Sequence, residues 1–185
     1  MGKIAELVKG KRIIDFGFAE TPNPFLEGGV IGVDINKPYK MPKNYDRFVQ
    51  QDLNETPYSF RSGYADCITA SEVIEHLERP YDFLKECHRI LKPKGKLLLS
   101  TPNAFYYTVF VSAMLGKWKV YAKKKTDEHL QEWSIPLMKY NLEKFGFKVV
   151  NVLPTFITIP KTRITIGLRK VLNLSSTVIY ECVRK

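Results

Sequence analysis

The chain contains 185 residues, of which 44% are hydrophobic and 26% are charged, a composition typical of a soluble globular protein. No apolar run approaches the roughly 20 residues that a membrane-spanning helix needs, so the sequence excludes a helical membrane protein. The formal net charge of +10 favours an anionic partner such as nucleic acid, a phosphorylated substrate or a membrane surface, although lysines spread over a solvated surface would give the same total.

The amino-terminal segment and the cysteines indicate the cellular compartment. Residues 1–16 lack the apolar core and the small-residue cleavage site of a signal peptide. Cys67, Cys87 and Cys182 lie far apart in the sequence and form no Cys-x-x-Cys pair, which argues against disulfides and against a bound metal. We therefore expect a cytoplasmic protein without a metal.

Short apolar segments alternate with helical patterns along the chain, which predicts a largely parallel sheet flanked by helices. A short entry helix is expected at residues 3–9. The predicted strands are 11–16, 29–34, 47–49, 65–70, 96–100, 147–153 and 177–183.

Two further helices have clear boundary signals. Pro80 suits the first turn of a helix whose apolar residues from position 83 to 91 share one face. Ser134 can cap the start of the other helix, and Gly146 occupies the usual position after its end. Between the first of these helices and the strand at 96–100, the residues Lys-Pro-Lys-Gly at 92–95 predict a turn.

Two less regular stretches, 104–130 and 154–176, interrupt this pattern. No long Gly/Ser-rich or Pro-rich linker divides the chain. We therefore predict a single domain over residues 1–185, with both stretches as lid-like insertions over the site.

Candidate ligand-binding residues follow four of the predicted strands, and in an open α/β sheet ligands bind beyond the carboxyl ends of the strands. After the first strand, the small residues Gly17 and Ala19 allow the backbone to approach a ligand closely. Asp34 ends the second strand and can accept hydrogen bonds from ribose hydroxyls, and Asp52 follows the third and can meet an adenine amino group. The fourth strand continues into Ser-Glu-Val-Ile-Glu-His-Leu at 71–77.

Each of these residues also has an ordinary structural interpretation. Asp15 can cap a helix or bind turn amides, Asp34 and Asp52 can be exposed turn acids, and His76 can be a surface residue with satisfied hydrogen bonds. The functional interpretation depends on the whole series, which occurs in order at successive strand ends.

This series resembles the class I S-adenosylmethionine-dependent methyltransferases, especially the group that includes ubiquinone-biosynthesis and sugar methyltransferases. The first motif of that family is similar to IIDFG, its ribose-binding strand to VIGVDIN, and its adenine-side motif to QQDLNE. The block at 71–103 is the most specific part of the resemblance. A histidine-containing loop of the family resembles HLQEWS at 129–134. In total the resemblance covers about residues 12–153.

The resemblance implies a Rossmann-like three-layer α/β sandwich with a mostly parallel seven-stranded sheet and an antiparallel last strand. It implies S-adenosyl-L-methionine as the cofactor, and methyl transfer to an oxygen or nitrogen atom of a small-molecule, glycan or lipid-linked acceptor. The residues expected to bind the cofactor are Asp15, Phe16, Gly17, Ala19, Asp34, Ile35, Asp52, Leu53, Ser71 and Glu72.

His76 and His129 are the candidate catalytic residues. Methyl transfer is an in-line displacement, and a hydroxyl acceptor benefits from a general base. Either histidine can equally position the substrate or pack. Tyr106 and Trp133 are expected to bind the acceptor.

The first motif departs from the family pattern, because glycines usually occupy three alternating positions that here hold Gly17, Ala19 and Thr21. Ala19 costs little if its φ is negative, whereas a positive φ would strain it. Thr21 adds bulk near the methionine part of the cofactor. A non-catalytic binding module that keeps the fold is therefore the alternative function. A dinucleotide-binding dehydrogenase fits less well, because Gly-x-Gly-x-x-Gly is missing.

Residues 104–125 combine an apolar, aromatic stretch with a basic one. We favour a lid helix over the site. The second interpretation is an interfacial element on anionic lipid, which would make the protein peripheral to a membrane. Nucleic-acid binding is the least favoured, because the sequence contains no known nucleic-acid module.

Overall fold

The computed structural model of the chain describes residues 2–8, 10–104, 106, 114, 116, 129–158, 165–167 and 175–185. Its centre is a seven-stranded sheet in the order β3-β2-β1-β4-β5-β9-β6. The strands are β1 (Arg12–Phe16), β2 (Gly29–Asp34), β3 (Tyr45–Gln50), β4 (Ala65–Ser71), β5 (Leu91–Pro102), β6 (Phe147–Pro154) and β9 (Thr177–Arg184). Strands β1 to β5 are parallel, and β9 is antiparallel to both β5 and β6. The predicted mixed sheet with its antiparallel last strand is confirmed.

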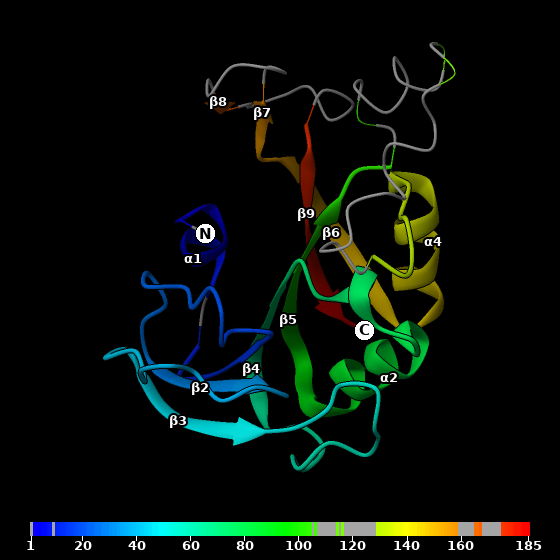
Figure 1. Ribbon diagram of the computed structural model, residues 1–185. Helices are drawn as coiled ribbons and strands as arrows, with labels where there is room; N and C mark the ends of the chain where they lie inside the picture. The colour runs from blue at the N-terminus through cyan, green and yellow to red at the C-terminus, as the bar shows by residue number, and fades with distance from the viewer. Residues whose placement is uncertain are drawn as a thin grey trace.

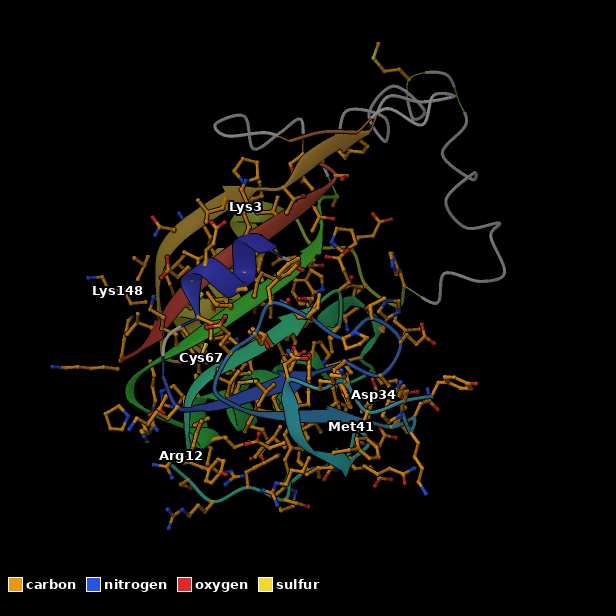
Figure 2. All side chains as sticks on the ribbon, turned by 90° about the vertical axis from the view of Figure 1, so that its left-hand side faces the viewer. Lys3, Arg12, Asp34, Met41, Cys67 and Lys148 are labelled. Atoms are coloured by element: carbon orange, nitrogen blue, oxygen red, sulfur yellow. The ribbon has the colours of Figure 1, made fainter. Side chains whose placement is uncertain are left out.

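Helices cover the two faces of the sheet unequally. On one face lie α2 (Pro80–Ile90) and α4 (Ile135–Lys144), and on the other lies α1 (Gly2–Leu7) (Figure 1). Figure 2 shows α1 lying across its face of the sheet, where Lys3 Nζ donates to the carbonyl oxygen of Pro154 at 2.5 Å. Each face has its own core cluster of buried apolar side chains.

The connections that follow β1, β2 and β3 contain turns and irregular backbone in place of the helices that the alternating pattern predicts. Prolines account for this difference, because a proline inside a helix removes a hydrogen bond and clashes with the preceding turn. They stand at positions 22, 24, 38, 42 and 57.

Phe18 covers part of the sheet where a helix would otherwise pack. Its ring is buried and stacks on Tyr45 with ring centroids 5.0 Å apart. A Cβ atom at Gly32 of β2 would lie 2.6 Å from the Phe18 ring, so only glycine fits beneath it. The segment between β1 and β2 is therefore anchored by one aromatic side chain.

The predicted boundaries of the two main helices are confirmed. Pro80 is in the first turn of α2, and Ser134 caps α4 through its Oγ, which accepts from the Leu137 amide at 3.3 Å. Gly146 follows α4 with a φ of +89°, a conformation that favours glycine.

The predicted turn at 92–95 is wrong, because those residues belong to β5. The pairing of β4 with β5 shifts register between Ala65 and Cys67, and Lys94 has a φ of +63°. The ion pair between Lys92 and Asp66 holds this irregular start of β5 against β4. An irregularity in the pairing of β4 with β5 thus stands where the turn was predicted.

The stretch 154–176 includes a two-stranded hairpin of β7 (Phe156–Thr158) and β8 (Thr165–Gly167). The other residues between 159 and 174, and most of 104–130, lie outside the described residues. The lid-like insertions and the single-domain organisation therefore stay predictions. Among the described residues, no helix combines the length and the apolar character that crossing a membrane requires.

Candidate functional site

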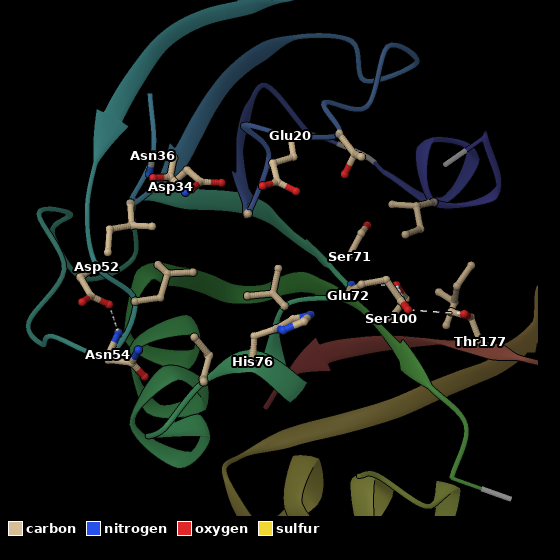
Figure 3. A pocket seen from close by; sticks show the side chains of 18 of the residues that line it. Glu20, Asp34, Asn36, Asp52, Asn54, Ser71, Glu72, His76, Ser100 and Thr177 are labelled. Atoms are coloured by element: carbon tan, nitrogen blue, oxygen red, sulfur yellow. Dashed lines mark hydrogen bonds between the residues drawn. The ribbon is translucent and has the colours of Figure 1, made fainter. Parts of the chain in front are cut away.

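A pocket of about 820 Å³ lies at the carboxyl ends of the parallel strands (Figure 3). The strand order changes direction between β1 and β4, and such a switch point opens a crevice in which α/β proteins bind ligands. Eight of the predicted site residues line this pocket. They are Gly17, Asp34, Ile35, Asp52, Leu53, Ser71, Glu72 and His76.

Asp34, the last residue of β2, is fixed by two backbone amides. Its Oδ2 accepts from the Ala19 amide at 3.0 Å, and its Oδ1 accepts from the Asn36 amide at 2.9 Å. A carboxylate offers about four acceptor positions, so two remain for a ligand. The geometry suits two neighbouring hydroxyl donors, as on a ribose.

Asp52 and Leu53 lie on the same side of the pocket as Asp34. Asp52 Oδ1 accepts from the Asn54 amide at 2.8 Å, and Asn54 Oδ1 in turn accepts from the Glu78 amide at 2.8 Å. This chain of bonds fixes the loop after β3 against the residues before α2. Leu53 and Ile35 add apolar surface beside the Asp52 carboxylate, a combination that fits a flat base with an amino group.

Gly17 brings the backbone of the first loop close to the end of β4. Its φ is +73°, and a Cβ atom there would lie 2.5 Å from Val73 Cγ2, so both conformation and space require glycine. Ala19 is not among the residues with positive φ, so alanine replaces the family's glycine there without backbone strain. Its side chain does not line the pocket, whereas Thr21 does.

Asp15 and Phe16 lie beneath this loop and do not line the pocket. Asp15 is buried and accepts hydrogen bonds from the hydroxyls of Thr69, at 2.5 Å, and Tyr45. Burial raises the pKa of Asp15 to about 6. Phe16 packs edge-on against Phe83 in the core. Both residues therefore support the loop, and their predicted role in cofactor binding stays a prediction.

Glu72 follows β4 in a strained conformation, with a φ of +54° that side chains other than glycine rarely adopt. Ser100 Oγ donates to its Oε1 at 2.9 Å, and Thr177 Oγ1 reaches its Oε2 at 3.5 Å. The surrounding protein desolvates the carboxylate and raises its pKa. The acid is nevertheless exposed to the pocket.

The two predicted histidines lie together. His76 belongs to the short 3₁₀ helix η1 (Ile74–His76), and its ring centroid lies 4.8 Å from that of His129, with the rings nearly perpendicular. The Glu75 carbonyl oxygen accepts from the amides of Leu130, at 2.9 Å, and Gln131, at 3.2 Å. These bonds hold the segment that begins at His129 against η1.

Glu75 is a site residue that the sequence interpretation missed. It is only 1% exposed, and neither carboxylate oxygen has a hydrogen-bond partner among the described residues. Burial, together with the neighbouring Glu72, raises its pKa to about 8. One ligand atom each from Glu75, His76 and His129 lies within 4.8 Å of the others, so these side chains could hold a divalent cation. The sequence-based expectation of no metal was drawn from the cysteines alone. The sequence signal for this possible cation site is the Glu-His pair at 75–76 together with a histidine distant in the sequence.

Tyr106 and Trp133, which were expected to bind the acceptor, are not among the described residues that line the pocket, and their role with the acceptor stays a prediction. Both are buried, and Trp133 belongs to the core cluster beneath α2 and α4, where its ring meets Tyr81 at 6.5 Å.

The other lining residues were not predicted as part of a site, apart from Thr21, whose bulk near the cofactor was expected. They are Ile4, Glu20, Asn36, Asn54, Val73, Leu77, Ser100, Thr155, Thr177 and Ile179. Strand β9 is antiparallel, so its start lies at the same edge as the ends of the parallel strands. A search of strand ends alone therefore misses Thr177.

A sequence model of the methyltransferase domain family matches residues 3–152. The chain is similar to a probable S-adenosylmethionine-dependent methyltransferase of Mycolicibacterium smegmatis, with 31% identity over 91 residues, covering 49% of this chain and 32% of that protein. It is also similar to the mitochondrial ubiquinone biosynthesis O-methyltransferase of Rattus norvegicus, with 27% identity over 115 residues, covering 52% and 32% respectively. The chain thus spans about a third of the length of these curated relatives.

Solved structures resemble the fold over nearly the whole chain. An S-adenosylmethionine-dependent methyltransferase from Thermotoga maritima has a TM-score of 0.73 at 15% identity, covering 98% of this chain and 86% of that one. Another, from Archaeoglobus fulgidus, has a TM-score of 0.67 at 19% identity, covering 100% and 90%.

Proposed function

The chain belongs to the methyltransferase domain family, with S-adenosylmethionine as methyl donor, and on this premise we propose that it transfers a methyl group to an oxygen or nitrogen atom of a small-molecule, glycan or lipid-linked acceptor. The observation that carries the proposal is the pocket at the β1–β4 switch point, where Asp34 and Asp52 follow neighbouring strands. A nucleoside fits this arrangement because each acid meets a different set of hydrogen-bond donors.

The residues of the pocket fit the donor. Asp34 keeps acceptor capacity for the ribose, and Asp52 with Leu53 offers a polar and an apolar contact for adenine. Gly17 lets the backbone approach the methionine part. When bound, S-adenosylmethionine supplies a methyl group on a positively charged sulfur; the chain's residues orient it and exclude water.

His76 is the candidate general base in this proposal. It is exposed and lines the pocket, so it can accept a proton from a hydroxyl acceptor. His129 contacts it and orients its ring. An amine acceptor would need this help less, because an uncharged amine is already nucleophilic.

Calorimetric titration with S-adenosylhomocysteine tests the donor site. We expect the wild type to bind and Asp34→Ala to lose affinity about 10- to 100-fold, the range for lost hydrogen bonds to a charged group. Asp46→Ala is the matched control, because Asp46 is exposed on β3 outside the pocket. Absence of binding by the wild type, or equal affinity in Asp34→Ala, would contradict the proposal.

We also propose a cytoplasmic protein, in which peripheral membrane contact through residues 104–125 is the second interpretation of that segment after the lid helix. That segment lies largely outside the described residues, and the proposal depends on its apolar and basic sequence. Co-sedimentation with liposomes should require anionic lipid and weaken as salt is added. Equal recovery in the supernatant with and without liposomes would rule out this contact.

A further inference from the structure

The charge of the pocket is opposite to that of the whole chain. The chain carries a formal net charge of +10. The described residues that line the pocket nevertheless include no lysine or arginine, but four acids: Glu20, Asp34, Asp52 and Glu72. A concave, partly desolvated wall strengthens the field of such charges. The pocket therefore disfavours anions even though the protein is basic.

Glu72 lies apart from the two acids assigned to the nucleoside. In Figure 3, Asp34 and Asp52 lie on one side of the pocket, and Glu72 lies on the other with Ser100 and Thr177. Gly17 and Val73, the residue after Glu72, meet across the crevice, since a Cβ atom at Gly17 would lie 2.5 Å from the Val73 side chain. Glu72 thus stands where the loop after β1 faces the end of β4.

Glu72 is the acid that lines the pocket on this side. The neighbouring Glu75 is buried and is not among the described residues that line the pocket. Glu72 instead lines the pocket and accepts from the hydroxyls of Ser100 and Thr177. Desolvation raises the pKa of Glu72, and these two hydrogen bonds oppose that effect by favouring the ionised form. The Glu72 amide donates a hydrogen bond to the Ser100 carbonyl oxygen at 3.1 Å, and this bond holds the strained backbone that directs the carboxylate toward the pocket.

We infer that Glu72 is a specificity-determining residue that makes the pocket select positive charge: it favours the sulfonium of S-adenosylmethionine over the neutral thioether of S-adenosylhomocysteine, and uncharged or cationic acceptors over anionic ones. The inference rests on the proposed function. In methyl transfer, a lone pair of the acceptor forms the new bond to carbon, the carbon–sulfur electron pair returns to sulfur, and the acceptor's proton passes to the general base, for which His76 is the candidate. The positive charge on sulfur therefore exists before transfer and is absent afterwards, so Glu72 holds the donor and not the product.

Calorimetric titration of S-adenosylmethionine and S-adenosylhomocysteine measures this selection without a known acceptor. In Glu72→Gln we expect the affinity for S-adenosylmethionine to fall on the order of tenfold, the scale of one screened charge pair, while the affinity for S-adenosylhomocysteine changes less than about twofold. Glu78→Gln is the matched control, because it removes an exposed carboxylate outside the pocket and should leave both affinities unchanged.

The outcomes separate this inference from the proposed function. If the wild type binds neither nucleoside, the donor site itself is refuted. If both bind and Glu72→Gln changes both affinities equally, or changes neither, the role of Glu72 is refuted and the donor site stands. If Glu72→Gln does not fold, the affinity of the wild type for sinefungin provides the test, because sinefungin has an ammonium group in place of the sulfonium. Sinefungin should then bind on the order of tenfold more tightly than S-adenosylhomocysteine, and equal affinities would overturn the inference.

Discussion

Asp15 gives the sharpest quantitative prediction, because it is a buried acid whose partners are both known. Burial raises its pKa from 3.8 to about 6, against the opposing effect of hydrogen bonds from Thr69 and Tyr45. As pH rises from 3.8, the unfolded chain releases the Asp15 proton while the folded protein retains it until about pH 6. The free energy of unfolding therefore falls across this window and levels off above it.

The size of the effect follows from the shift. At about 1.4 kcal/mol per pH unit, the window from 3.8 to about 6 corresponds to about 3 kcal/mol. Asp15→Asn removes the ionisation and keeps a similar side-chain volume. Because pH 4 already lies inside this window, the free energy of unfolding of Asp15→Asn, relative to the wild type, should increase by about 2.4 kcal/mol between pH 4 and pH 7.5.

Urea unfolding followed by circular dichroism at both pH values measures this difference. Other titrating groups contribute equally to wild type and variant, so they cancel in the comparison. Asp46→Asn, which changes an exposed acid on β3, should follow the wild type at both pH values. If the wild type and Asp15→Asn show the same pH dependence, Asp15 is not the desolvated acid that the structure describes.

Three further predictions concern Gly17 in the loop after β1, the packing of Phe18 on the sheet, and the histidine cluster. Gly17→Ala should lower the free energy of unfolding by about 1–3 kcal/mol and abolish binding of S-adenosylhomocysteine, because the new side chain meets both a positive φ and a clash with Val73. Gly63→Ala is the control, because Gly63 has a φ of +65° but open surroundings, so it measures the cost of φ alone. Equal losses of stability in the two variants would contradict the clash. Phe18→Ala should destabilise the protein by about 3–5 kcal/mol in thermal or urea unfolding, while Phe25→Ala, at an exposed ring, should have almost no effect; similar values would show that Phe18 does not anchor the loop. Mn²⁺ or Zn²⁺ should raise the Tm of the wild type and of His88→Ala, and EDTA should reverse the increase. The increase should be smaller in His129→Ala, which lacks one of the ligands. An unchanged wild-type Tm would exclude a cation at Glu75, His76 and His129.

The sequence predicted the elements whose signals are local. The strand at 29–34 is a buried run bounded by turn residues, and α4 begins after the Ser134 cap and ends before Gly146. Asp34 and Asp52 were placed correctly at the pocket because parallel strands end at one edge, so position along a strand decides position in space.

The remaining features depend on contacts that local signals do not contain. Thr177 reaches the pocket because β9 enters the sheet antiparallel, and Glu75 is buried because residues 129–131 dock on η1. Trp133 was expected to bind the acceptor, and its ring is part of the buried core cluster. The loop after β1 packs on the sheet through the Phe18 ring, which lies over Gly32, a position distant in the sequence where a side chain would clash with the ring.

The central claim is that the pocket at the β1–β4 switch point binds a methyl donor for catalysis. The most direct measurement is transfer of a radiolabelled methyl group from S-adenosylmethionine into a panel of hydroxyl and amine acceptors, with Asp34→Ala and Asp46→Ala in parallel. We predict labelled product from the wild type and from Asp46→Ala, and at least tenfold less from Asp34→Ala. Tight binding of S-adenosylhomocysteine with no labelled product from any acceptor class would contradict the claim and favour a non-catalytic binding module.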